Sequence, residues 1–154
     1  MNYPNLNIYL ASDHNGRYLQ EVIASYLDKQ KITWESFSKQ QKDPGDDYPD
    51  FAQPVGQSVS CDSQSRGILI CQTGIGMSIA ANKIPGVRAG VCRTPEDVKE
   101  AVAHNHLNVL CLGAGLLESS EVINIVKTFL ESSYSQEPRH VRRVDKIKDM
   151  EQCQ

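Results

Sequence analysis

Five short apolar runs recur along the chain, and longer, more polar stretches separate them. Runs such as GILIC and NVLCL are apolar throughout and do not alternate with polar residues. Continuous apolar runs are typical of parallel strands that helices cover on both faces. We therefore predict five parallel β-strands, at residues 6–10, 32–37, 67–71, 87–91 and 108–112.

The stretches between these runs place apolar residues at helical spacing. One of them opens with Thr94-Pro95-Glu96-Asp97, which supplies a capping residue, a proline at the first helical position and an acidic first turn. We expect an open, five-stranded, doubly wound α/β sheet. At 154 residues and 40% hydrophobic content, the chain is long enough for one core, so we expect a single domain over residues 1–154. The predicted helices span 17–29, 51–60, 95–103 and 118–130, with a charged C-terminal helix at about 138–150.

Charge and cysteine content narrow the class of protein. A formal net charge of -3 argues against a nucleic-acid partner or an anionic-membrane surface, because such binding usually needs a basic excess. No apolar run approaches the roughly 20 residues that span a bilayer, and the N-terminal residues do not read as an export signal. The five cysteines are an odd number without a C-x-x-C pair, which predicts reduced thiols in the cytoplasm. They are Cys61, Cys71, Cys92, Cys111 and Cys153.

Ligands of open α/β sheets bind beyond the carboxyl ends of the strands, where the strand order reverses. This rule directs attention to three polar segments. They are SDHNG after the first predicted strand, CQTGIGMS after the third, and the residues around His104-Asn105-His106, just ahead of the fifth.

The segment after the third strand runs through Thr73-Gly74-Ile75-Gly76 into a helix. Its backbone N–H groups would point outward at the positive end of the helix dipole, which makes an anion cradle. The alternative is a tight strand-to-helix turn that binds nothing. Cys71 ends the strand, so its sulfur could lie at the mouth of the cradle and act as a base. By position alone, however, such a cysteine is more often a small buried apolar residue.

Two histidine segments offer further acid/base groups. Asp13 and His14 could contact a sugar hydroxyl or a phosphate, although Asp13 could instead cap the following helix. His104 with Asn105 could be an acid/base and its orienting amide, or a polar helix end. His104 and His106 are two residues apart, but no acidic or cysteine ligand lies at a supporting spacing, so we predict no metal site.

The tail carries a cationic cluster of Arg139, His140, Arg142 and Arg143. Arg139 and Arg143 are one helical turn apart and could converge on one dianion, or could belong to a solvated basic face. A base, an anion cradle, a second acid/base and a phosphate clamp are the set that enolisation next to a carbonyl requires. With no metal ligands and no dinucleotide fingerprint, metal-free and cofactor-free aldose–ketose isomerisation is the simplest such reaction.

The chain resembles the type B ribose-5-phosphate isomerases, a family that also holds the galactose-6-phosphate isomerase subunits. The resemblance runs nearly from end to end. It rests on five blocks: SDHNG (12–16), DDYPDFA (46–52), GILICQTGIGMSIAANKIPGVRA (67–89), AHNHLNVLCLG (103–113) and RHVRRV (139–144).

The resemblance implies a Rossmann-like α/β/α sandwich that forms a homodimer, with a tetramer also open, and active sites built from both subunits. It implies that Cys71 moves the proton between C1 and C2 and that His104, delivered by the partner subunit, helps to open the furanose ring. The loop at 72–76 would hold the enediolate oxygens. The implied substrate-binding residues are Asp13, His14, Tyr48, Gln72, Thr73, Gly74, Ile75, Gly76, Asn105, Arg139 and Arg143.

The chain departs from the family pattern at three positions. Gln72 stands where many members have glycine, Gly115 where they usually have an arginine, and His106 where they have an acidic or amide residue. Two alternatives to ribose 5-phosphate isomerisation stay open. The substrate could be another phosphosugar, such as allose or galactose 6-phosphate. Alternatively, because Gln72 and Gly115 depart from the family pattern, the chain could be a paralogue that binds a phosphosugar without catalysis.

Overall fold

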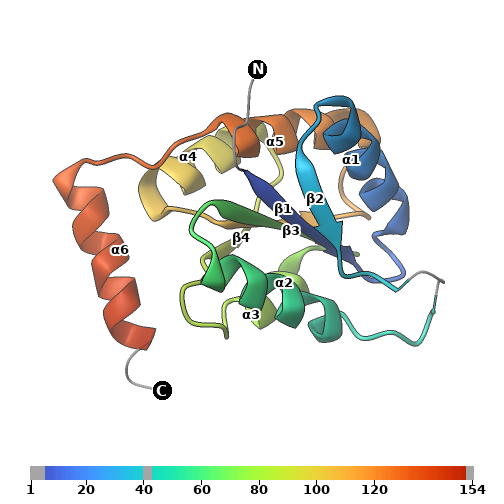
Figure 1. The fold of residues 1–154 in the computed structure, drawn as a ribbon, viewed down its shortest axis with the longest axis horizontal. Coiled ribbons are helices and arrows are strands. Elements are labelled where there is room, and N and C mark those ends of the chain that lie inside the picture. Colours follow the sequence, from blue (N-terminus) through green and yellow to red (C-terminus); the bar gives the residue numbers. More distant parts are fainter. Residues whose placement is uncertain (1–5, 40–42, 152–154) are drawn as a thin grey trace.

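The computed structural model describes residues 6–39 and 43–151, so that Cys153 lies outside the described residues. Its centre is a sheet of five strands, and every strand pair in it is parallel. The strand order is β2-β1-β3-β5-β4 (Figure 1). After β2 the chain crosses back over β1 to add β3 on its other side, so the strand order reverses between β1 and β3. The strands are β1 (Asn7–Ser12), β2 (Thr33–Ser36), β3 (Ser65–Cys71), β4 (Ala89–Val91) and β5 (Val109–Gly113).

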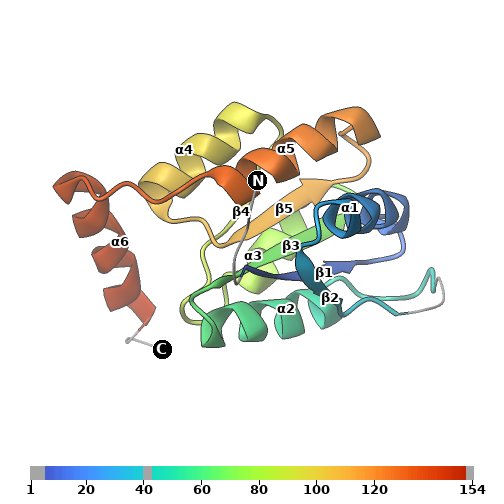
Figure 2. The same cartoon turned by 45° about the horizontal axis from the view of Figure 1, so that its top comes forward.

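Helices cover both faces of this sheet, which confirms the predicted α/β/α fold. Figure 2 shows α4 and α5 above the sheet and α2 below it, with α6 standing to one side. The predicted helices and strands agree with the observed ones to within about three residues at their ends. The helices are α1 (Arg17–Lys29), α2 (Pro49–Cys61), α3 (Ile75–Ala81), α4 (Pro95–Asn105), α5 (Ser119–Glu131) and α6 (Pro138–Glu151).

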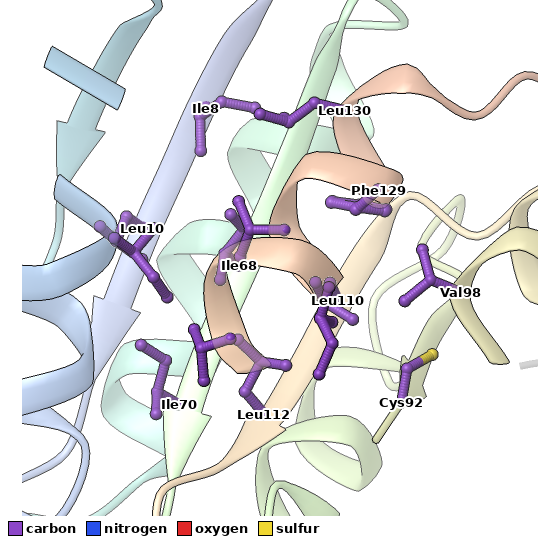
Figure 3. Close-up of a cluster of buried hydrophobic side chains, with 14 of the residues drawn as sticks. Ile8, Leu10, Ile68, Ile70, Cys92, Val98, Leu110, Leu112, Phe129 and Leu130 are labelled. Atoms are coloured by element: carbon purple, nitrogen blue, oxygen red, sulfur yellow. The ribbon is translucent and has the colours of Figure 1, made fainter. Parts of the chain in front are cut away.

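The apolar run of β3 is continuous because its side chains enter two different cores. Ile68 and Ile70 point into the cluster beneath α1, α4 and α5, together with Leu110 and Phe129 (Figure 3). Leu69 points to the opposite face, into the cluster beneath α2 and α3. Successive side chains of a strand alternate between faces, so a strand that is covered twice has no polar face.

Local sequence signals set the start of α4 as predicted. The Thr94 side chain accepts a hydrogen bond from the Asp97 backbone N–H at 3.1 Å, and the Asp97 carboxylate accepts from the Thr94 N–H at 3.1 Å. This capping box gives hydrogen-bond partners to two backbone N–H groups at the N-terminus of the helix, which have no carbonyl partner within the helix. None of the helices in the described part of the chain is both long and apolar enough to cross a membrane.

Two half-buried arginines stabilise the edge of the sheet where the strands begin. The Arg66 guanidinium donates to the backbone carbonyls of Phe129 and Ser132, at the end of α5. Arg88 donates from Nε to the carbonyl of His106 at 2.7 Å, at the end of α4. Neither arginine has an ion-pair partner among the described residues, and burial lowers the pKa of both. Their charge stabilises the negative ends of two helix dipoles.

Replacing Arg66 with methionine is expected to lower the free energy of unfolding by about 2–3 kcal/mol, because two carbonyls lose charged donors. Urea unfolding followed by circular dichroism measures the change. The control is Arg93→Met, since Arg93 is exposed and we expect little change there. Equal stability losses in the two variants would contradict the capping role of Arg66.

Candidate active site

The carboxyl ends of β1, β3 and β5 meet at one edge of the sheet. Ser12 pairs with Ile70, and Cys71 pairs with Gly113, so the segments that follow these strands are neighbours. The prediction that SDHNG and CQTGIGMS meet at this edge is confirmed. The segment 113–115 joins them there: the Ala114 N–H donates to the Cys71 carbonyl at 2.8 Å.

Cys71 is buried at the mouth of the loop that follows β3, with 5% of its surface exposed. Its Sγ accepts a hydrogen bond from the Gly74 backbone N–H at 3.2 Å. Gly74 has a φ of +78°, in the left-handed region, which turns the chain sharply into α3. An N–H donor aimed at sulfur stabilises negative charge on it, so the geometry suits a thiolate base.

Tyr48 forms one wall of this loop. It is the residue before α2, and Pro49 follows it at the first helical position. A Cβ placed on Gly76 would lie 2.8 Å from Cζ of Tyr48, so the tyrosine ring rests directly against the Gly76 backbone. With 40% of its surface exposed, Tyr48 keeps contact with solvent at the opening.

Asp13 and His14 have different local roles. Asp13 Oδ1 accepts from the backbone N–H groups of Asn15 at 2.9 Å and Gly16 at 3.2 Å, which stabilises the turn before α1. Among the described residues, no side chain caps the first turn of α1 itself, so the capping alternative for Asp13 is wrong. His14 Nδ1 lies 2.6 Å from Asp46 Oδ1, which fixes the ring. The Asn15 amide lies 2.9 Å from Nε2 of the same ring. Because a carboxylate only accepts hydrogen bonds, His14 donates from Nδ1 to Asp46 Oδ1.

Asp46 was missed as a site residue by sequence reasoning. It belongs to the block DDYPDFA, but nothing in its spacing indicates that it reaches back over 32 positions to His14. Its side chain is 5% exposed, which is unusual for a loop aspartate and reflects the pairing. The run of acidic residues suggests that one of them pairs with a donor group, but it identifies neither the residue nor its partner.

The prediction that His104-Asn105-His106 lies with the other two segments is wrong within one chain. These residues precede β5, and residues that precede a parallel strand lie at its amino end. The six steps from Ser65 to Cys71 on the neighbouring strand correspond to about 20 Å at about 3.3 Å per residue. His104 and Cys71 therefore lie at opposite edges of the sheet.

His104 packs against α6. Its ring centroid is 4.3 Å from that of His140, which is 2% exposed and whose Nδ1 has no hydrogen-bond partner among the described residues. Burial, followed by the nearby His104 and Arg139, lowers the pKa of His140. Asn105 ends α4 and is exposed beside this contact. His104 and Asn105 therefore lie at the amino ends of the strands, and the His104 ring contacts α6 there.

Arg139 and Arg143 follow each other on α6, one turn apart. Arg139 Nε donates to Glu137 Oε2 at 2.8 Å, and both side chains are exposed. Arg143 is exposed and has no ion pair with the described residues. Both arginines thus lie at the edge that carries His104, and far from Cys71. Among the described side chains, no group of three or more His, Cys, Asp or Glu could hold a metal ion.

The sequence profile of the ribose/galactose isomerase family matches residues 8–147 of this chain. The chain belongs to the ribose/galactose isomerase family. A probable ribose-5-phosphate isomerase B of Mycoplasma pneumoniae is 39% identical over 147 residues, which cover 96% of this chain and 94% of the relative. The resemblance stated from the five sequence blocks is thereby confirmed.

Solved structures agree with this assignment. Ribose-5-phosphate isomerase B of Mycoplasma genitalium, crystallised with bound ribulose 5-phosphate, gives a TM-score of 0.91 at 39% identity and covers 96% of this chain and 97% of its own. The isomerase B of Clostridium thermocellum gives 0.90 at 38% identity, with 96% and 98% covered. Family and fold are therefore established by both sequence and structure.

His106, one of the departures from the family pattern, ends the helix that carries His104 and packs against Tyr134. It ends α4 in the left-handed conformation with a φ of 56°, and its ring stacks on Tyr134 at a centroid distance of 4.3 Å. Burial lowers the pKa of His106, and the positive charges of Arg88, Lys148 and Arg66 lower it further. Its imidazole therefore packs on the segment that precedes α6, in surroundings that disfavour the charged form of the ring.

We expect His106→Asn to make stability less dependent on pH, since asparagine tolerates the left-handed conformation but does not titrate. The unfolded chain binds a proton at this histidine near pH 6.5, before the folded chain does, so acid favours unfolding. As pH falls from about 7 to 5, the wild type should lose stability relative to the variant. Urea midpoints measured across that range test this, and parallel curves would contradict it.

Proposed function

We propose that this chain is an aldose–ketose isomerase that interconverts ribose 5-phosphate and ribulose 5-phosphate, as its named relatives do. The observation that carries the proposal is the Cys71 sulfur, which ends β3 and accepts the Gly74 N–H at 3.2 Å in a buried loop mouth. This is the geometry of a base beside backbone donors. The family match and the relative that binds ribulose 5-phosphate support the same reaction.

Cys71 removes the proton from C2 of the open-chain aldose, and the electron pair of the C–H bond moves to form the enediolate. The charge that develops on oxygen is held by backbone N–H groups of the loop at 72–76. The protonated sulfur then returns its proton to C1 while the proton of the C2 hydroxyl passes to O1, so that C2 becomes the carbonyl carbon of the ketose. Left-handed Gly74 fixes the loop in advance, so little reorganisation accompanies the reaction.

Ring opening needs a second acid/base at the sugar, and His104 is the candidate. Because His104 and Cys71 lie at opposite edges of one sheet, a single chain cannot bring both to one substrate. Two copies related by a two-fold axis can bring the two residues together, and each copy would then contribute to two equivalent sites. We therefore infer a homodimer in which His104 and Asn105 of one chain face Cys71 of the other.

The phosphate is assigned to α6 of the same partner. Arg139 and Arg143 are exposed, one turn apart and close to the His104 edge, so they would arrive together with His104. Glu137 already neutralises part of the Arg139 charge, which makes Arg143 the stronger candidate for the dianion. Asp13, His14 and Tyr48 are assigned to the sugar, with Asp46 holding the His14 ring.

We place the whole chain in one catalytic domain that acts in the pentose phosphate pathway. A thiolate base requires a reduced cysteine, which favours the cytoplasm as the site of action. The described cysteines, Cys61, Cys71, Cys92 and Cys111, are all free thiols. No cofactor enters the reaction as proposed.

Cys71→Ser is expected to keep the fold and to lower kcat for ribose 5-phosphate by about 10²- to 10⁴-fold, because a hydroxyl is a far weaker base than a thiol. Steady-state conversion of ribose 5-phosphate, beside allose and galactose 6-phosphates, is the assay. The control is Cys61→Ser, at the exposed end of α2, which should keep full activity. Near-normal turnover by Cys71→Ser would remove Cys71 as the base.

Mixing Cys71→Ser with His104→Ala should restore activity that neither variant has alone. After complete subunit exchange about half of the dimers are mixed, and each has one intact site, so about a quarter of wild-type activity is expected. The control is each variant taken alone through the same exchange procedure. Absence of recovery, with exchange demonstrated by mass spectrometry, would mean that one chain supplies both residues.

A further inference from the structure

The Gln72 side chain lies across the backbone of Gly115. A Cβ placed on Gly115 would be 2.2 Å from Nε2 of Gln72 and 2.9 Å from its Cδ. These separations are far below a normal contact between unbonded atoms. The carboxamide of Gln72 therefore occupies the space in which any side chain at position 115 would begin.

The backbone around this contact is tied down on both sides. The Gly115 N–H donates to the Gln72 carbonyl at 2.9 Å, one residue beyond the bond between Ala114 and Cys71. Gly115 does not have a positive φ, so an alanine there would not be strained by its backbone angles. The closest atoms to a Cβ at position 115 are therefore those of the flexible Gln72 side chain, which would have to move aside.

The Gln72 carboxamide is available to a ligand. Gln72 is exposed, and its side chain makes no hydrogen bond with the described residues. Gln72 directly follows Cys71, and its amide lies against Gly115, in the segment whose Ala114 N–H donates to the Cys71 carbonyl. A carboxamide carries two N–H donors and a carbonyl acceptor, which matches a sugar hydroxyl better than a group that only donates.

We propose that Gln72 and Gly115 form a coupled specificity pair, in which the empty position at 115 lets the Gln72 carboxamide hydrogen-bond a hydroxyl of the phosphosugar. The proposal rests on the isomerase function proposed above. The bonded hydroxyl is not the group whose charge changes, so the contact binds the ground state and the transition state about equally. Its loss is therefore seen in KM more than in kcat.

The test is a double-mutant cycle of Gln72→Ala, Gly115→Ala and the two together, assayed for KM and kcat with ribose 5-phosphate. Gln72→Ala is expected to raise KM by about 3- to 10-fold, the worth of one neutral hydrogen bond, with kcat within about twofold. Gly115→Ala should raise KM by a similar factor, because its methyl group displaces the carboxamide. The double variant should match either single variant.

The control is Gln64→Ala, since Gln64 is an exposed glutamine at the opposite edge of the sheet and KM should not change there. If the KM increases of the two single variants multiply in the double variant, the residues act separately and the coupling is overturned. An unchanged KM in Gln72→Ala removes the substrate contact. A wild-type protein that converts no phosphosugar would instead refute the isomerase function itself.

Discussion

The parallel direction of all five strands is the constraint on which the rest of the structure depends. It gathers every segment that follows a strand at one edge and every segment that precedes a strand at the other. Cys71 and its loop therefore lie at the opposite end of the strands from His104, and the length of β3 between the two ends is about 20 Å at about 3.3 Å per residue. Under the mechanism proposed above, catalysis by both groups requires two chains, and α6, which stands apart in Figure 1, would reach the second one.

At the carboxyl ends of the strands, the candidate site depends on close contacts between side chains and the backbone of glycines. Left-handed Gly74 aims an N–H at the Cys71 sulfur, and Tyr48 closes over Gly76. The Gln72 carboxamide fills the space that Gly115 leaves open. In the proposed reaction, these contacts would hold Cys71 and the N–H donors of its loop in place before a substrate arrives.

The sequence predicted the elements and the meeting of the segments that follow β1 and β3. Continuous apolar runs identified β3 and β5 because both faces are buried, and the residues from Thr94 to Asp97 marked the start of α4. The edge of His104 was assigned wrongly, because a rule for residues after strands was applied to a segment before one. The pairing of His14 with Asp46 could not be predicted, since it depends on how a 32-residue separation closes in space.

The most direct test of the shared site is a crystal structure of the protein with ribulose 5-phosphate. The account predicts a dimer in which each sugar lies beside Cys71 of one protomer, with His104 and Arg143 supplied by the other. The phosphate should lie against α6 of that second protomer. A sugar bound entirely by residues of one chain, or bound away from Cys71, would contradict the account.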